Sequence, residues 1–179
     1  MINTNAHSVR ERQDPLRQAY RTQAELAQIT DRAETSDAVQ DNPFNGWVKA
    51  GNEADTPGIR FGIHRAVGGY HDAPNPGDFL CAALAACLDS TIRIIAERMK
   101  VKLEKLTVEV TADVDVRGTL MVSREVPVGF QSINCAVNIQ AVAGTDPKVV
   151  QTLISTAEHC CVNMQTLRHG TQINTSVNH

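Results

Sequence analysis

The sequence lacks a long apolar run. The longest run, residues 79–88, spans ten residues and is followed by Asp89, whereas a membrane-spanning helix needs about 20. No apolar segment follows the basic residues near the N-terminus, so this end does not resemble a secretory signal. We therefore expect no membrane segment and a cytoplasmic location.

Neither sign of charge dominates. The chain has 17 Lys and Arg against 20 Asp and Glu, a net charge of −3, without a long basic run. A surface that follows nucleic-acid phosphates needs clustered basic residues, so nucleic acid is not an expected partner. The 179 residues, 42% of them hydrophobic, are enough for one domain with its own core.

The five cysteines form no CxxC pair and match no disulfide framework; they are Cys81, Cys87, Cys135, Cys160 and Cys161. His159 beside two adjacent cysteines leaves a tetrahedral metal site short of ligands. The sequence also has no Gly-x-Ser-x-Gly elbow and no dinucleotide-binding glycine motif in the required context. We expect no metal and no cofactor, and thiols that are either core residues or reactive groups.

Residues 1–35 predict an N-terminal arm helix that begins at Asp14-Pro15, and residues 36–179 a single domain. Within that domain, short strands are predicted near residues 46–50 and 59–63, between turn-forming residues.

The segment 74–78 opens a helix that is predicted to run from Phe79 to about Lys100, with Asp78 as its cap. This helix is apolar on nearly all sides for three turns, which is typical of a buried central helix. Strict alternation over residues 106–116 and again over 133–141 predicts two antiparallel strands.

A further helix is predicted after Asp146-Pro147, and its apolar stripe contains Val150, Leu153, Ile154, Ala157, Cys161 and Met164. Residues 171–177 alternate as an edge strand would. The order of elements indicates an α+β fold with helices against antiparallel sheet. Since one sheet covers only one face of the central helix, we expect an extensive homodimer.

Two cysteines lie where helix faces can meet. Cys87 is deep in the central helix and Cys161 is on the apolar stripe of the later one. Two thiols in contact can run a cycle in which one becomes a sulfenic acid and the other captures it as a disulfide. A structural role as small core residues is the alternative for each, and Cys135 and Cys81 fit that role.

The segment 74–87 (PNPGDFLCAALAAC), followed by residues 157–162 (AEHCCV) and 165–167 (QTL), resembles the osmotically inducible protein C and organic hydroperoxide resistance (OsmC/Ohr) family. The resemblance covers about residues 44–177. It implies an intertwined homodimer with two long central helices held between antiparallel sheets. It also implies a peroxidatic cysteine at Cys87 and a resolving one at Cys161, with Cys160 in a variable position. The implied substrate is an organic hydroperoxide, and the implied reductant is a dithiol such as a lipoylated protein.

One position departs from the family pattern. Gly77 stands where the family commonly has a Glu that holds an Arg against the thiolate. Asp78 is a candidate substitute for that Glu, and Arg60 and Arg65 are candidates for the arginine. The departure favours an alternative in which the protein binds a small hydrophobic ligand at the dimer interface without catalysis. In a further alternative, the thiols act as a redox sensor and the arm helix passes the signal on.

Overall fold

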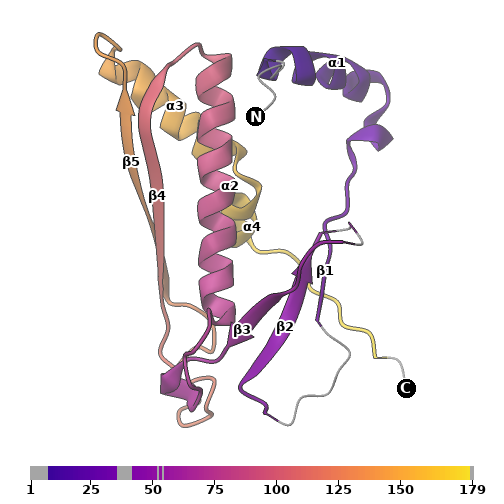
Figure 1. The fold of residues 1–179 in the computed structure, drawn as a ribbon, viewed down its shortest axis with the longest axis vertical. Coiled ribbons are helices and arrows are strands. Elements are labelled where there is room, and N and C mark those ends of the chain that lie inside the picture. Colours follow the sequence, from indigo (N-terminus) through magenta and orange to yellow (C-terminus); the bar gives the residue numbers. More distant parts are fainter. Residues whose placement is uncertain (1–7, 36–41, 52, 54, 178–179) are drawn as a thin grey trace. The chain divides into compact units, whose positions relative to one another are not determined.

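The computed structural model describes residues 8–35, 42–51, 53 and 55–177. The described residues form two compact units, the first from residues 8–11, 82–110 and 135–177 and the second from within residues 12–81 and 111–134. The architecture is α+β with antiparallel sheets, as the sequence predicts (Figure 1). In chain order the elements are α1 (Val9–Thr22), the short 3-10 helix η1 (Ala24–Ala27), β1 (Ala33–Thr35), β2 (Asn45–Ala50), β3 (Ile59–Gly62), the short 3-10 helix η2 (Arg65–Val67), α2 (Pro76–Arg98), β4 (Leu103–Asp113), β5 (Ser132–Ala141), α3 (Pro147–Cys160) and α4 (Val162–His169).

The second unit contains an antiparallel sheet in the order β1, β2, β3. Strands β2 and β3 confirm the two short strands predicted near residues 46–50 and 59–63. Gly46 pairs with Phe61, and a Cβ on Gly46 would lie 2.5 Å from the Phe61 ring, so a larger residue here would have to displace that ring. Strand β1 lies in the segment that was predicted to be a helical arm, and the helical part of that arm ends at Ala27.

Helix α1 begins at Val9, so the prediction that it begins at Pro15 is wrong. A capping box explains the earlier start. The Ser8 amide donates to Glu11 Oε2 at 2.7 Å, and the Glu11 amide donates to Ser8 Oγ at 3.2 Å. At the same end, Arg10 Nη2 donates to the Arg98 carbonyl at the C-terminus of α2, at 2.6 Å.

Helix α2 also begins earlier than predicted, at Pro76, and its capping residue is Asn75 rather than Asp78. Asn75 Oδ1 accepts from the amides of Gly77 at 2.8 Å and Asp78 at 3.3 Å. Asp78 Oδ2 in turn accepts from the Asn75 amide at 2.8 Å and from Asn75 Nδ2 at 2.7 Å. Asp78 therefore completes a capping box at the third helical position.

The C-terminus of α2 is closed by a Schellman motif. Lys100 has φ of 59°, and its amide donates to the Glu97 carbonyl at 3.0 Å. The Val101 amide donates to the Ala96 carbonyl at 2.8 Å, and both side chains are buried.

The core of the first unit lies along one face of α2. Leu84, Leu88, Ile92 and Ala96 are buried at a spacing of four residues, which places them on one helix face. The other buried hydrophobic residues are Val101, Leu106, Leu153, Ala157, Cys161 and Met164. The exposed residues of α2 include Ala82, Ala83, Ala86 and Ile94. One chain alone therefore leaves part of α2 uncovered, whereas the sequence predicts a helix that is buried on nearly all sides.

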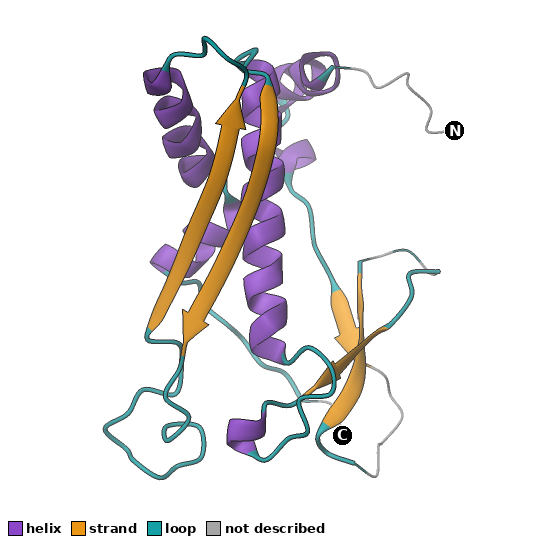
Figure 2. Cartoon of the chain, turned by 60° about the vertical axis from the view of Figure 1, so that its left-hand side comes forward, coloured by secondary structure: helices purple, strands orange, loops and turns teal. Residues whose placement is uncertain are grey.

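Strands β4 and β5 form a two-stranded antiparallel sheet that runs beside α2 (Figures 1 and 2). The Gln131 amide donates to the Asp113 carbonyl at 2.8 Å, and the Val142 amide donates to the Lys102 carbonyl at 3.0 Å. The alternation thus predicts both strands, although β4 begins and ends three residues before the predicted 106–116.

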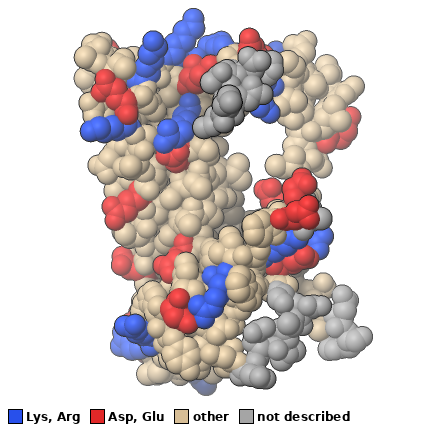
Figure 3. All heavy atoms as spheres, in the orientation of Figure 1, with Lys and Arg blue, Asp and Glu red and all other residues tan. Residues whose placement is uncertain are grey.

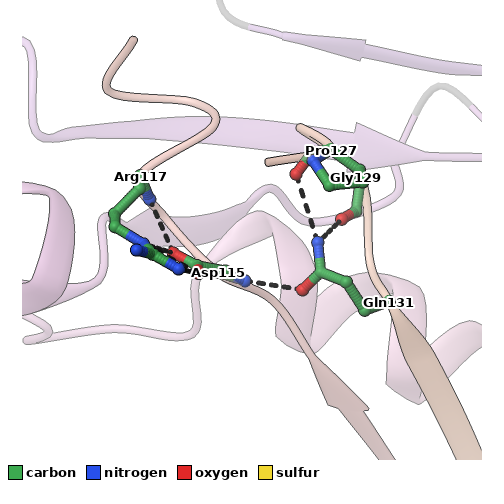
Figure 4. A network of polar contacts seen from close by, with 5 residues as sticks. All are labelled: Asp115, Arg117, Pro127, Gly129 and Gln131. Atoms are coloured by element: carbon green, nitrogen blue, oxygen red, sulfur yellow. Dashed lines mark hydrogen bonds and ion pairs between the residues drawn. The ribbon is translucent and has the colours of Figure 1, made fainter. Parts of the chain in front are cut away.

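The connection between β4 and β5, residues 114–131, is held by a polar network (Figure 4). Gln131 accepts from the Asp115 amide at 2.7 Å and donates to the carbonyls of Pro127 at 3.1 Å and Gly129 at 2.6 Å. Arg117 Nε donates to the Asp115 carboxylate, at 2.9 Å to Oδ2. The hydrogen bonds from Arg117 lower the pKa of Asp115.

The predicted helix after Asp146-Pro147 is present, with Asp146 as its cap, but it is broken at Cys161 into α3 and α4. Residues 171–177 are irregular and exposed, so the predicted edge strand is wrong. Among the described residues, α2 is long and apolar enough to cross a membrane. Core helices of soluble proteins have the same length and composition. On the face drawn in Figure 3, acidic and basic side chains are interspersed.

Candidate functional site

Cys87 lies on α2 within the first unit, next to the buried stripe of that helix. Leu84 and Leu88 on the stripe are buried, and Cys87 itself is half-buried. The hydroxyls of Thr91 and Ser90 donate to the Cys87 carbonyl at 2.7 and 3.0 Å. The thiol is thus held on a regular helix, at the border between core and surface.

Cys161 occupies the break between α3 and α4. Its backbone has φ of −74° and ψ of 108°, which ends α3 and makes Cys161 the residue that precedes α4. The side chain is fully buried, with 0% exposure. The sequence prediction that Cys161 faces the interior is therefore confirmed, although the residue lies outside both helices.

Cys87 lies near enough to Cys161 to influence the pKa of its thiol. Burial raises the pKa of Cys161, and the neighbouring Cys87 raises it further. The amides of Met164 and Asn163 at the start of α4 act in the opposite direction, because partial positive charge at a helix N-terminus favours a thiolate. The net direction is upward, so Cys161 retains its proton.

Side chains of α3 and α4 stabilise the break on either side of Cys161. Gln165 Nε2 donates to the Glu158 carbonyl at 2.8 Å, and the Gln165 amide donates to the Cys161 carbonyl at 3.0 Å. Arg168 forms an ion pair with Glu158 at 3.2 Å. The Glu158 carbonyl lies in the last turn of α3, where the broken helix supplies no backbone donor for it. The Gln165 side chain supplies that donor.

Asn163 links α4 to α2. Its Nδ2 donates to the Ala83 carbonyl at 2.9 Å. Sequence analysis assigns no role to Asn163 or Gln165. Both residues carry a polar amide shortly after Cys161, on a segment with an apolar stripe. Hydrophobic periodicity identifies the stripe but does not say what these amides bind.

The candidate supporting residues Asp78, Arg60 and Arg65 belong to the second unit and bond within it. Arg60 Nη2 pairs with Asp72 Oδ2 at 2.7 Å, and this hydrogen bond lowers the pKa of Asp72. Arg65 Nε donates to the Tyr70 carbonyl at 3.3 Å. Asp78 serves the capping box, so the function that the structure displays for it is structural.

Gly77 is packed against an aromatic ring. A Cβ at this position would lie 3.0 Å from Asn75 Oδ1 and 3.1 Å from Phe130 Cζ. A glutamate here would have to displace its neighbours by a few tenths of an ångström. The ring of Phe130 thus occupies the space beside the backbone from which a side chain at position 77 would extend.

The remaining cysteines differ in environment. Cys160 is exposed, while Cys81 and Cys135 are half-buried. Burial raises the pKa of Cys81, and the Asp78 charge adds to this effect. Within the described ranges, no group of three or more His, Cys, Asp or Glu side chains is arranged to hold a metal ion.

Residues 69–176 match the family described as OsmC-like protein, and this range is more than half of the chain. The chain belongs to the OsmC-like protein family. No curated protein sequence matches this OsmC-like protein.

Solved structures show the same fold. An organic hydroperoxide resistance protein from Elizabethkingia anophelis, crystallised with thiocyanate, is 22% identical with a TM-score of 0.60, over 80% of this chain and 91% of that one. An OsmC-like protein from Mycoplasma pneumoniae is 16% identical with a TM-score of 0.61, over 79% and 89%. An OsmC-like protein of unknown function from Vibrio cholerae is 10% identical with a TM-score of 0.63, over 78% and 94%.

Proposed function

We propose that this OsmC-like protein is a thiol-dependent peroxidase that reduces organic hydroperoxides, with Cys87 as the nucleophile and Cys161 as the resolving cysteine. The observation that carries the proposal is that the start of α4, directly after the buried Cys161, is hydrogen-bonded to α2 one turn before Cys87, through Asn163 and Ala83. The proposal also agrees with the similarity in fold to an organic hydroperoxide resistance protein.

The environments of the two cysteines support this division of roles. Cys161 is fully buried and its pKa is raised, so it keeps its proton and can donate a hydrogen bond to the Cys87 sulfur. The thiolate is the reactive form of a cysteine nucleophile. Cys87 is half-buried and therefore open to a small peroxide, whereas Cys161 is not.

The proposed cycle balances in three steps. The Cys87 thiolate attacks one peroxide oxygen, the O–O bond breaks, and the leaving alkoxide takes up a proton to become an alcohol. The sulfur of Cys161 then attacks the Cys87 sulfenic acid, the S–S bond forms, and the hydroxyl group leaves with the proton of Cys161 as water. A dithiol reductant finally exchanges with the disulfide and restores both thiols while it is itself oxidised.

The partners proposed for this cycle are a dithiol, such as a lipoylated protein, and a second copy of the chain. Exposed apolar residues of α2, including Ala82, Ala86 and Ile94, support a homodimer, because a second copy would bury them. Light scattering after gel filtration tests the dimer. A reducing, cytoplasmic location is proposed because the cycle starts from free thiols.

The decisive experiment treats the reduced protein with stoichiometric cumene hydroperoxide, follows thiol loss, and maps disulfides by mass spectrometry. We expect a Cys87–Cys161 disulfide in the native protein and in the Cys160→Ser control. Cys161→Ser should accumulate a Cys87 sulfenic acid that dimedone traps, and Cys87→Ser should not react. If Cys87 stays reduced in a large excess of peroxide, the peroxidase proposal fails.

A second candidate function is non-catalytic binding of a small hydrophobic ligand, and the packing of Phe130 on Gly77 favours it. This position carries no carboxylate to hold an arginine, and the ring fills the space beside it. Cumyl alcohol, the unreactive product of cumene hydroperoxide, separates the two functions. If it raises the melting temperature while Cys87 remains reduced under peroxide, ligand binding is the better description. If peroxide oxidises the cysteines but dihydrolipoamide does not sustain repeated turnover, a redox sensor is the better description.

A further inference from the structure

A hydrogen bond joins α4 to α2 beside the cysteine pair. The Asn163 side chain donates from Nδ2 to the Ala83 carbonyl at 2.9 Å, although the two residues are 80 positions apart in the sequence. Both residues belong to the first unit, as do Cys87 and Cys161. Asn163 is half-buried, while Ala83 lies at an exposed position of α2, so the hydrogen bond is at the surface.

The position of each partner relates this bond to the thiols. Ala83 precedes Cys87 by four residues, so its carbonyl is also the acceptor of the Cys87 amide in the helical ladder. Asn163 follows Cys161 by two residues, in the first turn of α4, and its backbone amide acts to lower the pKa of Cys161. Asn163 thus joins the segment that follows Cys161 to the turn of α2 that precedes Cys87.

We propose that Asn163 is a positioning residue, whose side chain fixes the start of α4 against α2 and keeps Cys161 within reach of Cys87. The kinetic consequence rests on the proposed peroxidase function. It concerns only the second step, in which the Cys161 sulfur attacks the Cys87 sulfenic acid and water leaves. The first step uses Cys87 and the peroxide, so Asn163 leaves it unchanged.

The geometry indicates the size of the effect. Loss of one neutral hydrogen bond of ordinary strength lowers the population of the aligned pair about fivefold. We therefore expect disulfide formation to slow about fivefold in Asn163→Ala and in Asn163→Asp, because a carboxylate cannot donate to the Ala83 carbonyl. Asn163→Gln keeps the amide donor on a longer side chain and should recover part of the rate.

The kinetic test separates the two steps in one reaction. Reduced protein is mixed with cumene hydroperoxide and quenched at intervals with dimedone, and mass spectrometry measures the Cys87 adduct and the Cys87–Cys161 disulfide. Thr166→Ala, at an exposed position of α4, is the control for a general disturbance of the helix. The expected result is unchanged consumption of Cys87 thiol with a larger dimedone fraction in Asn163→Ala and Asn163→Asp, and native behaviour in Thr166→Ala.

A second measurement does not depend on peroxide chemistry. Equilibration with reduced and oxidised glutathione gives the effective concentration of the two thiols for each other, which should fall about fivefold in Asn163→Ala and Asn163→Asp. If the native protein fails to react with peroxide but this fall is observed, the peroxidase proposal is wrong and the positioning role stands. An unchanged effective concentration overturns the positioning role whatever the peroxide result.

Folding is checked by circular dichroism. Should Asn163→Ala fail to fold, Asn163→Asp and Asn163→Gln provide the comparison, because Asp keeps the size of the side chain and is favourable in the first turn of a helix, and Gln keeps the amide. Equal effective concentrations in the Asp and Gln variants would then refute a role for the donated hydrogen bond.

Discussion

The capping box at the start of α2 gives the sharpest test of what Asp78 does. Asn75 Oδ1 accepts from two helix amides that lack a partner within the helix, and Asp78 returns the bond to the Asn75 amide. Removal of such a cap costs about 1–2 kcal/mol. We expect Asn75→Ala to lower the free energy of unfolding by about this amount, and Asp78→Ala by about 1 kcal/mol because its contacts are exposed.

The two residues also bond directly, from Asn75 Nδ2 to Asp78 Oδ2 at 2.7 Å. Their substitutions should therefore not be additive, and the double variant should be more stable than the sum of the single effects predicts by about 0.5–1 kcal/mol. Urea denaturation of the reduced protein at one fixed protein concentration measures all four corners of the cycle.

Asp78→Asn separates capping from charge. The amide oxygen of an asparagine can still accept from the Asn75 amide, so most of the stability should remain, while the negative charge is lost. The charge of Asp78 contributes to the raised pKa of Cys81, after burial, so the pKa of Cys81 should fall in this variant. The rate at which peroxide consumes Cys87 should not change; a slower rate in a fully stable Asp78→Asn protein would refute the assignment of Asp78 as a structural cap.

Three further predictions concern the frame of the site. Lys100→Gly should stabilise the protein by about 0.5–1 kcal/mol in urea denaturation, because φ of 59° favours glycine; a loss of stability would contradict the Schellman assignment. Gly118→Ala should destabilise it by about 1–3 kcal/mol, because the new Cβ would lie 2.7 Å from the Pro127 carbonyl oxygen, and an unchanged melting temperature would contradict this. Burial raises the pKa of Cys161, so its contribution to stability is complete below the ordinary thiol pKa of about 8.5 and is lost as pH rises through the raised value. Cys161→Ser should accordingly flatten the decline of unfolding free energy at alkaline pH, and an equally steep decline would argue against the shift.

Periodicity predicts the elements whose burial is local in sequence. The alternation around residues 106–116 and 133–141 marks β4 and β5, because a strand with one buried face must alternate. The apolar run that begins at Phe79 marks α2, because a helix that contributes to the core must carry apolar residues on its buried face. Its start was misplaced because Asp78 and Asn75 are both good capping residues, and only the reciprocal bonds decide between them.

The start of α1 shows a different limit. Proline is common in the first turn of a helix, which makes Pro15 an attractive beginning. The capping box of Ser8 and Glu11 lies one and a half turns earlier, and it satisfies two helix-end donors that Pro15 cannot influence. The sequence contains this signal, and the competing proline obscured it.

The break at Cys161 is the feature that sequence periodicity could not reveal, because it depends on a contact that exists only once the helix is broken. In a continuous helix, Gln165 would lie about 10 Å along the axis from Glu158, too far to bond its carbonyl. After the break, Gln165 Nε2 reaches that carbonyl at 2.8 Å. The apolar stripe predicts that Cys161 is buried, and its side chain is buried. The break adds that Cys161 directly precedes the amides of α4, which act to lower the pKa of its thiol, whereas burial raises it.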